Sequence, residues 1–312
     1  MARVMRRWLL TAVPVVLIVS LLTFVLTSFV PGDAARAILG LQASEEQVQA
    51  LRDQMGLGKP LPQQYWDWLV GVLHGDLGRS IQTRGLVASE LAHRAEVTLS
   101  LLVLGVLIVA LVGITLGVIS AVRGGRIGRM VDVLSLAGIA VPGFWLGLVL
   151  VALFAVMIPL FPATGYVSFT HSVPGWIASL ALPLLTLALT GTATLAKQTR
   201  SNVLDELGKD YVRMLRARGI PERRILLVHV LRNAAGPVVT IVGLTFIGLV
   251  GGAVLLETVF VLPGVGMLMV QASKAHDIPV IQGVTLMVSL VVVVVNLLVE
   301  ISYALLDPRV RS

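Results

Sequence analysis

The chain has 312 residues, of which 56% are hydrophobic and only 13% are charged, and its mean hydropathy is +0.92. This balance is typical of an integral membrane protein and argues against a soluble globular domain. The absence of cysteine excludes disulfides, thiolate metal sites, cysteine nucleophiles and a lipidated cysteine anchor. The net charge of +7 would suit nucleic-acid binding, but membrane topology explains where the basic residues lie, so we expect no nucleic-acid partner.

Six charge-free apolar segments are long enough to cross a bilayer. At 1.5 Å per residue, about 20 helical residues span a hydrocarbon core of about 30 Å. Backbone polar groups must be paired within lipid, so each segment is predicted to be a helix, and Pro142 is predicted to kink the third. The segments are 9–30, 97–122, 133–158, 176–196, 237–256 and 280–299.

The first segment follows Arg3, Arg6 and Arg7, as the apolar core of a secretory signal would. Its apolar stretch of 22 residues exceeds the roughly 7–15 of a typical signal core, and no small-x-small cleavage site follows. We therefore expect an uncleaved first membrane helix.

Lysine and arginine counts predict the orientation of the six spans. With the N-terminus inside, the inner segments hold 17 basic residues and the outer segments hold seven, six of which lie in the long loop 31–96. Basic residues are retained on the cytoplasmic side, and long loops cross largely regardless of charge. The sequence thus predicts that both termini lie in the cytoplasm.

The outer loop 31–96 carries helix signals of its own. Ser44 and Gln47 form a capping box ahead of an amphipathic stretch. Tyr65, Trp66 and Trp68 then accompany aliphatic residues, which suits a helix at the lipid–water boundary or a packed outer subdomain; both readings stay open.

Glycine pairs four residues apart predict close helix packing within the spans, as for Gly113 with Gly117, Gly143 with Gly147, and Gly248 with Gly252. We divide the chain by position into a first helix (1–30), an extracytoplasmic loop with short amphipathic helices (31–96) and a five-helix core (97–312) that includes the cytoplasmic loop 197–236.

Motifs for independent chemistry are missing. No glycine lies where a P-loop requires one before Gly58-Lys59 or Gly208-Lys209, and the five histidines form no i, i+4 pair. The span cores lack ionisable residues; Asn296 and Glu300, near the inner end of the last span, come closest, and their role stays open. We expect no catalytic residue, no metal site and no ATPase site, and pore-lining residues are not identified.

The segment 209–234 concentrates nine charged residues. Inserting them into a bilayer would cost more than about 20 kcal/mol, at about 2.5 kcal/mol each, so the segment is expected to stay outside the membrane.

Local signals divide this segment into two short helices. Asp205 is a candidate N-cap for a first helix ending near Arg218, and Gly219 suits its C-terminal end. Pro221 suits the start of a second helix that continues to Asn233. Such a helix-turn-helix could enter a groove on another protein, or its arginines could hold lipid phosphates; the residues alone leave both open.

Several motifs resemble one family along almost the whole chain. Tyr211-x5-Ala217-x-Gly219, followed by a basic helix ending "HVLRNA", is similar to the cytoplasmic loop of permeases of the dipeptide/oligopeptide/nickel ABC importer family. Further agreeing stretches are "FVPGD" (29–33), "MGLGKPLPQQYWDWL" (55–69), "HGDLGRS" (74–80), "ETVFVLPGVG" (257–266) and "YALLDPRVR" (303–311).

This resemblance implies an all-α, six-helix type I importer permease in the cytoplasmic membrane of a prokaryote. It also implies three kinds of partner besides the bilayer: a second, homologous permease subunit, two ATP-binding-cassette ATPase subunits that carry ATP and magnesium, and an extracytoplasmic substrate-binding protein contacted by the outer loop and the segment 257–280. The cytoplasmic loop would form the coupling helix that docks on an ATPase subunit. The residues assigned to docking are Tyr211, Arg213, Arg216, Ala217, Arg218, Gly219, Pro221, Glu222, Arg223 and Arg224.

The implied activity is import by alternating access, with no enzyme activity in this chain. Short peptides are the expected cargo, and glutathione or nickel complexes are the alternatives within the same machinery. A membrane enzyme acting on lipids and a passive channel are the rival functions.

Overall fold

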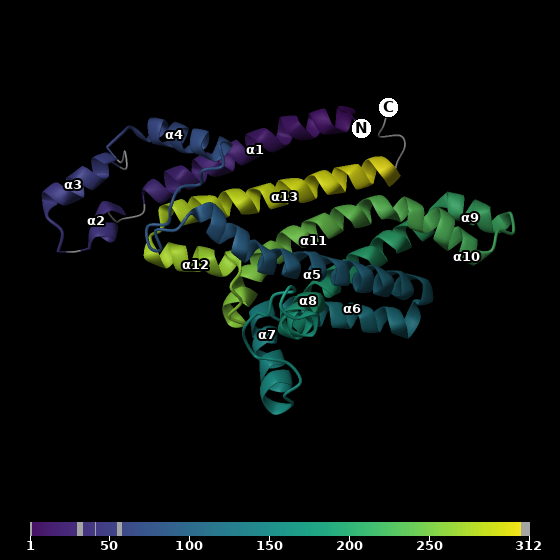
Figure 1. The fold of residues 1–312 in the computed structure, drawn as a ribbon. Coiled ribbons are helices and arrows are strands. Elements are labelled where there is room, and N and C mark those ends of the chain that lie inside the picture. The colour runs from purple at the N-terminus through teal and green to yellow at the C-terminus, as the bar shows by residue number, and fades with distance from the viewer. Residues whose placement is uncertain (1, 30–33, 41, 55–57, 307–312) are drawn as a thin grey trace. The chain divides into compact units, whose positions relative to one another are not determined.

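A computed structural model describes residues 2–29, 34–40, 42–54 and 58–306 (Figure 1). Helices dominate these ranges, and their one extended pairing is an isolated bridge between Arg79 and Leu86. The all-α prediction is confirmed. Residues 30–33, 55–57 and 307–311 of the resemblance motifs lie outside the described residues.

The spans are four long helices, a long rod and a bent pair. α1 (Ala2–Ser28), α5 (Val87–Arg123), α8 (Val173–Leu207) and α13 (Ile278–Leu306) are apolar enough to cross a membrane, and so is the continuous rod Glu222–Val259, which contains α11 (Leu231–Val259). The described residues thus give five spans, or six when the bent pair counts as one, in agreement with the predicted segments.

The third predicted span is broken rather than kinked. α6 (Gly125–Ala140) ends before Pro142. α7 (Gly143–Val151) follows at an angle of 94° to α6 and continues directly into a π-helix, η1 (Ala152–Met157). Val141 has extended backbone angles, φ −89° and ψ 122°, because the proline ring disfavours a helical conformation in the residue before it. Proline therefore ends one helix here and begins another.

Contacts group the chain into two compact units, Met1–Met5 with Val97–Leu262 and Val294–Ser312, and Arg6–Glu96 with Pro263–Val293. The division by chain position at 30 and 96 stays a prediction.

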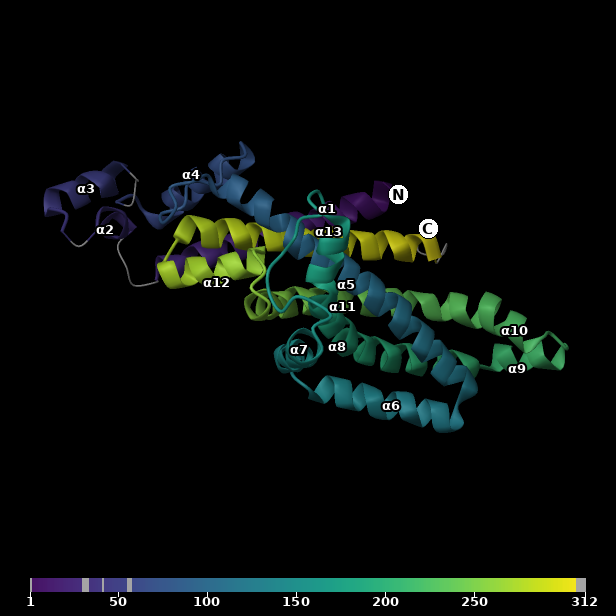
Figure 2. The same cartoon turned by 60° about the horizontal axis from the view of Figure 1, so that its bottom comes forward.

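In the first unit, α8 is the central helix and packs against α6, α7 and α11 (Figures 1 and 2). Glycine allows the close approach of α5: a Cβ atom on Gly117 would lie 2.6 Å from Cβ of Thr199, and one on Gly113 would lie 3.0 Å from Cβ of Leu195. Gly248 has nothing within 4 Å of such an atom, so the glycine pairs do not share one role.

The outer end of α11 is fixed by buried groups of the first unit. Glu257 is fully buried and accepts a hydrogen bond of 2.6 Å from Thr98 Oγ1. Phe260 is also buried; it lies against Gly147, and its carbonyl accepts a bond from the Gly165 amide at 3.1 Å. The stretch that begins the "ETVFVLPGVG" motif is therefore anchored to α5, α7 and the loop before α8.

The second unit contains α2 (Ala34–Leu39), α3 (Glu45–Gln54), α4 (Leu61–Leu73) and α12 (Val265–Ala275). The capping box is confirmed, because the Ser44 amide donates to Gln47 Oε1 at 3.1 Å and the Gln47 amide donates to Ser44 Oγ at 3.3 Å. Tyr65 of α4 packs edge-on against Phe24 of α1 and its hydroxyl lies 2.9 Å from Ser20 Oγ, so α4 is packed against a membrane helix.

A buried carboxylate ties the outer loop to the start of α13. Asp277 is 2% exposed and accepts hydrogen bonds from the hydroxyl of Ser80 at 2.5 Å and from the amides of Ile81 and Gln82 at 3.1 and 3.2 Å. A buried carboxylate is stable when such donors replace its water. This clamp lies beside an apolar cluster that α5 and α12 contribute to, among them Val87 and Leu268.

Candidate functional site

The charged segment forms the end of the first unit where α8 and α11 meet. α9 (Asp210–Ala217) and α10 (Glu222–Arg224) lie there in both views (Figures 1 and 2). α10 continues through a second π-helix, η2 (Ile225–Val230), directly into α11. The site is thus a short helix joined to the ends of two spans.

Two predicted helix boundaries are wrong. Asp205 does not cap the first short helix but lies in α8, which continues to Leu207, and α9 begins only at Asp210. The second helix does not end at Asn233, because α11 runs through that residue. In both cases buried side chains keep the helix going beyond the apolar segment, as Val203 and Val230 do.

Gly219 ends α9 as predicted. It has a left-handed φ of +73°, which glycine adopts without a steric penalty. Its amide donates to the Arg216 carbonyl at 2.9 Å, and the Ile220 amide donates to the Leu215 carbonyl at 3.2 Å. These two bonds and the Leu215–Ile220 pair in one apolar cluster define a Schellman motif, which fixes where the chain turns toward α10.

An apolar cluster packs against the buried face of α9, which carries Val212 and Leu215. Its buried members come from α5, α8, α9, η2 and α11, and they are Ala121, Val203, Val212, Leu215, Ile225, Val230 and Ala234. At about 25 cal/mol per Å² of apolar surface removed from water, such a cluster stabilises a helix too short to form alone. α9 therefore moves with the ends of the spans it packs on.

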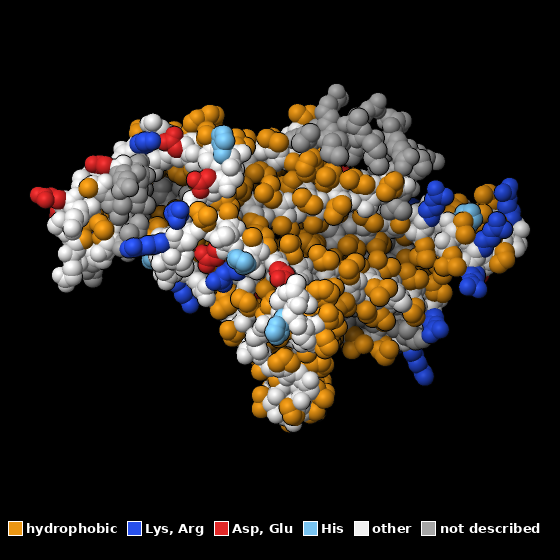
Figure 3. All heavy atoms as spheres, viewed as in Figure 1, with side chains coloured by type: hydrophobic (Ala, Val, Ile, Leu, Met, Phe, Trp, Pro, Cys, Tyr) orange, Lys and Arg blue, Asp and Glu red, His pale blue; other side chains and the backbone are white. Residues whose placement is uncertain are grey.

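The opposite face of α9 and the following turn are exposed and basic. Lys and Arg side chains gather over this end of the first unit (Figure 3). Nine of the ten residues predicted to dock are exposed here: Arg213, Arg216, Ala217, Arg218, Gly219, Pro221, Glu222, Arg223 and Arg224. Met214, which sequence reasoning missed, is 50% exposed among them and adds an apolar contact to the face.

An ion pair spans the turn between the two short helices. Arg216 Nε lies 2.6 Å from Glu222 Oε1, and a second guanidinium nitrogen donates to Oε2 at 3.3 Å. A forked, bidentate pair has a defined geometry, so it holds α10 in register with α9 although both groups are largely exposed.

Tyr211, the tenth predicted residue, is placed differently. It is half-buried, and its hydroxyl donates to Glu206 Oε1 at 2.9 Å and accepts from Asn233 Nδ2 at 3.2 Å. Burial raises the pKa of the Tyr211 phenol, and the hydrogen bond to the Glu206 carboxylate raises it further, so the phenol keeps the proton that it donates. Lys209 Nζ lies 2.5 Å from the other Glu206 oxygen.

Sequence reasoning missed Glu206 and Asn233 as members of this site. Their signal was local: Glu206 is an acidic residue in the last turn of α8, just before the charged segment, and Asn233 is an amide in the first turn of α11, at the end of that segment. The pairing depends on how α8 and α11 meet, which spacing alone does not reveal.

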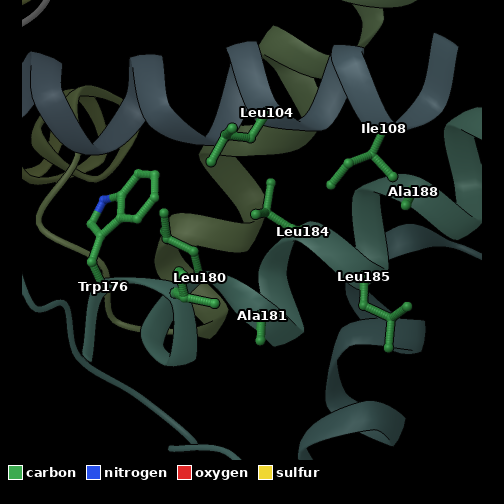
Figure 4. A pocket seen from close by; sticks show the side chains of 9 residues that line it. Leu104, Ile108, Trp176, Leu180, Ala181, Leu184, Leu185 and Ala188 are labelled. Carbon is green, nitrogen blue, oxygen red and sulfur yellow. The ribbon is translucent and has the colours of Figure 1, made fainter. Parts of the chain in front are cut away.

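A cavity of about 400 Å³ opens between α5 and α8 and is lined almost wholly by apolar side chains (Figure 4). Leu104 and Ile108 line it from α5, and α8 supplies a row from Trp176 to Ala188. A peptide would bring charged termini and amides that need partners when desolvated, so this cavity does not suit a peptide.

Among the described residues, no group of three or more His, Asp or Glu side chains is arranged to hold a metal ion.

Comparisons with known proteins cover nearly the entire chain. Residues 113–312 match the family described as binding-protein-dependent transport system inner membrane component, and residues 1–102 match the N-terminal region of the same kind of membrane component. A putative peptide transport system permease protein of Brucella abortus (strain 2308) is 44% identical over 301 residues, 96% of each chain.

Two further relatives differ in the cargo that their names give. A probable peptide ABC transporter permease protein of Sinorhizobium fredii is 39% identical over 306 residues, 98% of each chain. A glutathione transport system permease protein of Pectobacterium atrosepticum is 38% identical over 304 residues, 97% of each chain.

Proposed function

We propose that this chain, which belongs to the family of binding-protein-dependent transport system inner membrane components, carries short peptides into the cell. It is a multi-pass permease of the prokaryotic cytoplasmic membrane and a transport subunit rather than an enzyme. A lipid-acting enzyme and a passive channel are accordingly not retained. The observation that supports a peptide cargo is the pair of end-to-end relatives named as peptide permeases.

The proposed orientation places α9, α10 and both termini in the cytoplasm. The support is the excess of basic residues on the segments that would then be internal, which includes the arginines of α9. The loop that carries α3 and α4 would face the outside, where a substrate-binding protein delivers cargo.

The exposed basic face defined above is the proposed docking surface for an ATPase subunit. The described chain offers an exposed guanidinium row on a helix whose other face is buried, which suits an acidic or hydrogen-bonding groove. ATP and magnesium would be bound by two such subunits, since the sequence of this chain has no P-loop. A second, homologous permease chain would complete the pathway.

The proposed mechanism is alternating access. Closure of the ATPase subunits would displace α9, and α8 and the rod containing α11 would follow because they share one apolar cluster with it. Substrate would cross between the two permease subunits as they rock.

We expect deletion of this chain to abolish uptake of a labelled tripeptide that wild-type cells import, and plasmid-borne wild-type chain to restore it. Competition then separates the cargoes: excess unlabelled peptide suppresses uptake, whereas a nickel–histidine complex leaves it unchanged. Glutathione, itself a tripeptide, is included as a second competitor, and suppression by glutathione would place it among the cargoes. Unaltered peptide uptake in the deletion strain, with nickel uptake lost, would contradict the proposal.

A further inference from the structure

One hydroxyl of a half-buried tyrosine joins three helices at the docking surface. Tyr211 lies on α9, its donor bond goes to Glu206 on α8 and its acceptor bond comes from Asn233 on α11. The phenol thus uses both its donor and its acceptor capacity on groups of two different spans.

The Glu206 carboxylate is buried and therefore depends on its hydrogen-bond and ion-pair partners. Glu206 is 6% exposed, and its two oxygens face Tyr211 and Lys209 at 2.9 and 2.5 Å. Without the phenol donor, Lys209 would still pair with one carboxylate oxygen, but the other oxygen would lose its donor, and an unsatisfied buried acceptor costs more than the loss of an exposed contact. The Glu206 carboxylate on α8 therefore holds the phenol of Tyr211 in place.

The apolar cluster alone would let α9 rotate about its axis, and the hydrogen bonds of Tyr211 prevent this rotation. Val212 and Leu215 pack α9 against neighbouring side chains, but apolar contacts are non-directional and tolerate sliding. Hydrogen bonds with lengths of 2.9 and 3.2 Å are directional, so they fix the rotation of α9 about its axis. That rotation decides which way Arg213 and Arg218 point.

We infer that Tyr211 is a positioning residue that locks the docking helix to both spans, with Glu206 and Asn233 as its partners, and is not itself a contact to the ATPase. This inference rests on the proposed function, because it assigns Tyr211 a part in transmitting movement from the ATPase subunits. It predicts that loss of the hydroxyl separates ATP hydrolysis from transport and leaves assembly intact.

The test is Tyr211→Phe in the complete transporter, reconstituted into liposomes with its ATPase subunits, partner permease and binding protein. We expect the amount of peptide taken up per ATP hydrolysed to fall about tenfold, the scale of one lost hydrogen bond to a buried charge. Retention of the ATPase subunits during purification is expected to match the wild type. Tyr166→Phe is the matched control, because it removes a half-buried phenol hydroxyl that accepts a hydrogen bond of 3.2 Å from Trp176 Nε1, far from α9 in sequence, and it should leave the ratio unchanged.

A second variant distinguishes positioning from mere stability. Glu206→Gln keeps an acceptor oxygen for the phenol, so it should lower the ratio less than Tyr211→Phe, and the double variant should be no worse than Tyr211→Phe alone. Reduced ATPase retention with a normal ratio would overturn the inference and make Tyr211 a docking contact; an unchanged ratio with normal retention would overturn it too. Failure of the proposed function looks different, since the wild-type complex itself would then show no ATP-dependent peptide uptake.

Discussion

Reversing the charge of Arg213 and Arg218 together is expected to abolish peptide uptake while the chain still inserts into the membrane. Both side chains are exposed, and Arg213 makes only a 3.4 Å contact with the equally exposed Asp210, so neither supports the fold. The reversed, acidic side chains would meet a groove that is complementary to arginine, and such like-charge contacts cost several kcal/mol. A cost of about 3 kcal/mol corresponds to a loss of more than about 100-fold in affinity for the ATPase subunit. Uptake of labelled peptide and the amount of chain in isolated membranes are the two measurements.

The matched control is charge reversal of Arg126 and Arg129 in α6. These side chains are also exposed and lie on another segment assigned to the cytoplasm, so the change in charge asymmetry across the membrane is the same. We expect the control to retain uptake. Normal uptake by the Arg213/Arg218 variant at normal abundance would show that these two arginines are not part of the docking surface.

Replacing Gly117 by alanine is expected to destabilise the first unit more than the same change at Gly248. A Cβ atom at 117 would lie 2.6 Å from Cβ of Thr199 and 2.7 Å from the Ala196 carbonyl oxygen, so α5 and α8 would have to separate. Overpacking of this kind costs about 1–3 kcal/mol, which lowers the unfolding temperature by several degrees. The measurement is the thermal unfolding midpoint of the purified protein in detergent.

Gly248→Ala provides the comparison, because no atom lies within 4 Å of the added methyl group. Alanine also has a higher helix propensity than glycine, by about 1 kcal/mol, so this variant is expected to unfold at the wild-type temperature or above it. Equal midpoints for the two variants would show that α5 and α8 are not packed as closely as described.

The apolar spans were predictable because backbone polar groups must be hydrogen-bonded within lipid, and a helix satisfies this requirement within one segment. Among the described residues, five of the predicted segments each lie in one helix and the third is a bent pair, and the signals around Ser44 and Gly219 gave the expected cap and turn. These features depend on residues close in sequence.

Helix ends outside the apolar segments were harder to predict. α8 extends to Leu207 because Val203 and Glu206 are buried by other helices, and that burial overrides the capping preference of Asp205. The break at Pro142 was foreseen only as a kink, since its angle depends on the packing of α7 against α8 and α11.

The position of the docking surface stays a prediction. Charge density and resemblance indicate this segment, and most of the assigned residues are exposed there. The inward direction of Tyr211 follows from Glu206 and Asn233, which only the folded chain brings together.

Cysteine labelling can show whether α9 meets an ATPase subunit in the cytoplasm. The chain has no cysteine, so Met214→Cys places a single thiol on the exposed face of α9. The account predicts that a membrane-impermeant maleimide labels this thiol in inside-out vesicles but not in intact cells, and that crosslinking from it captures a P-loop ATPase subunit. Labelling from the outside of intact cells would contradict the account.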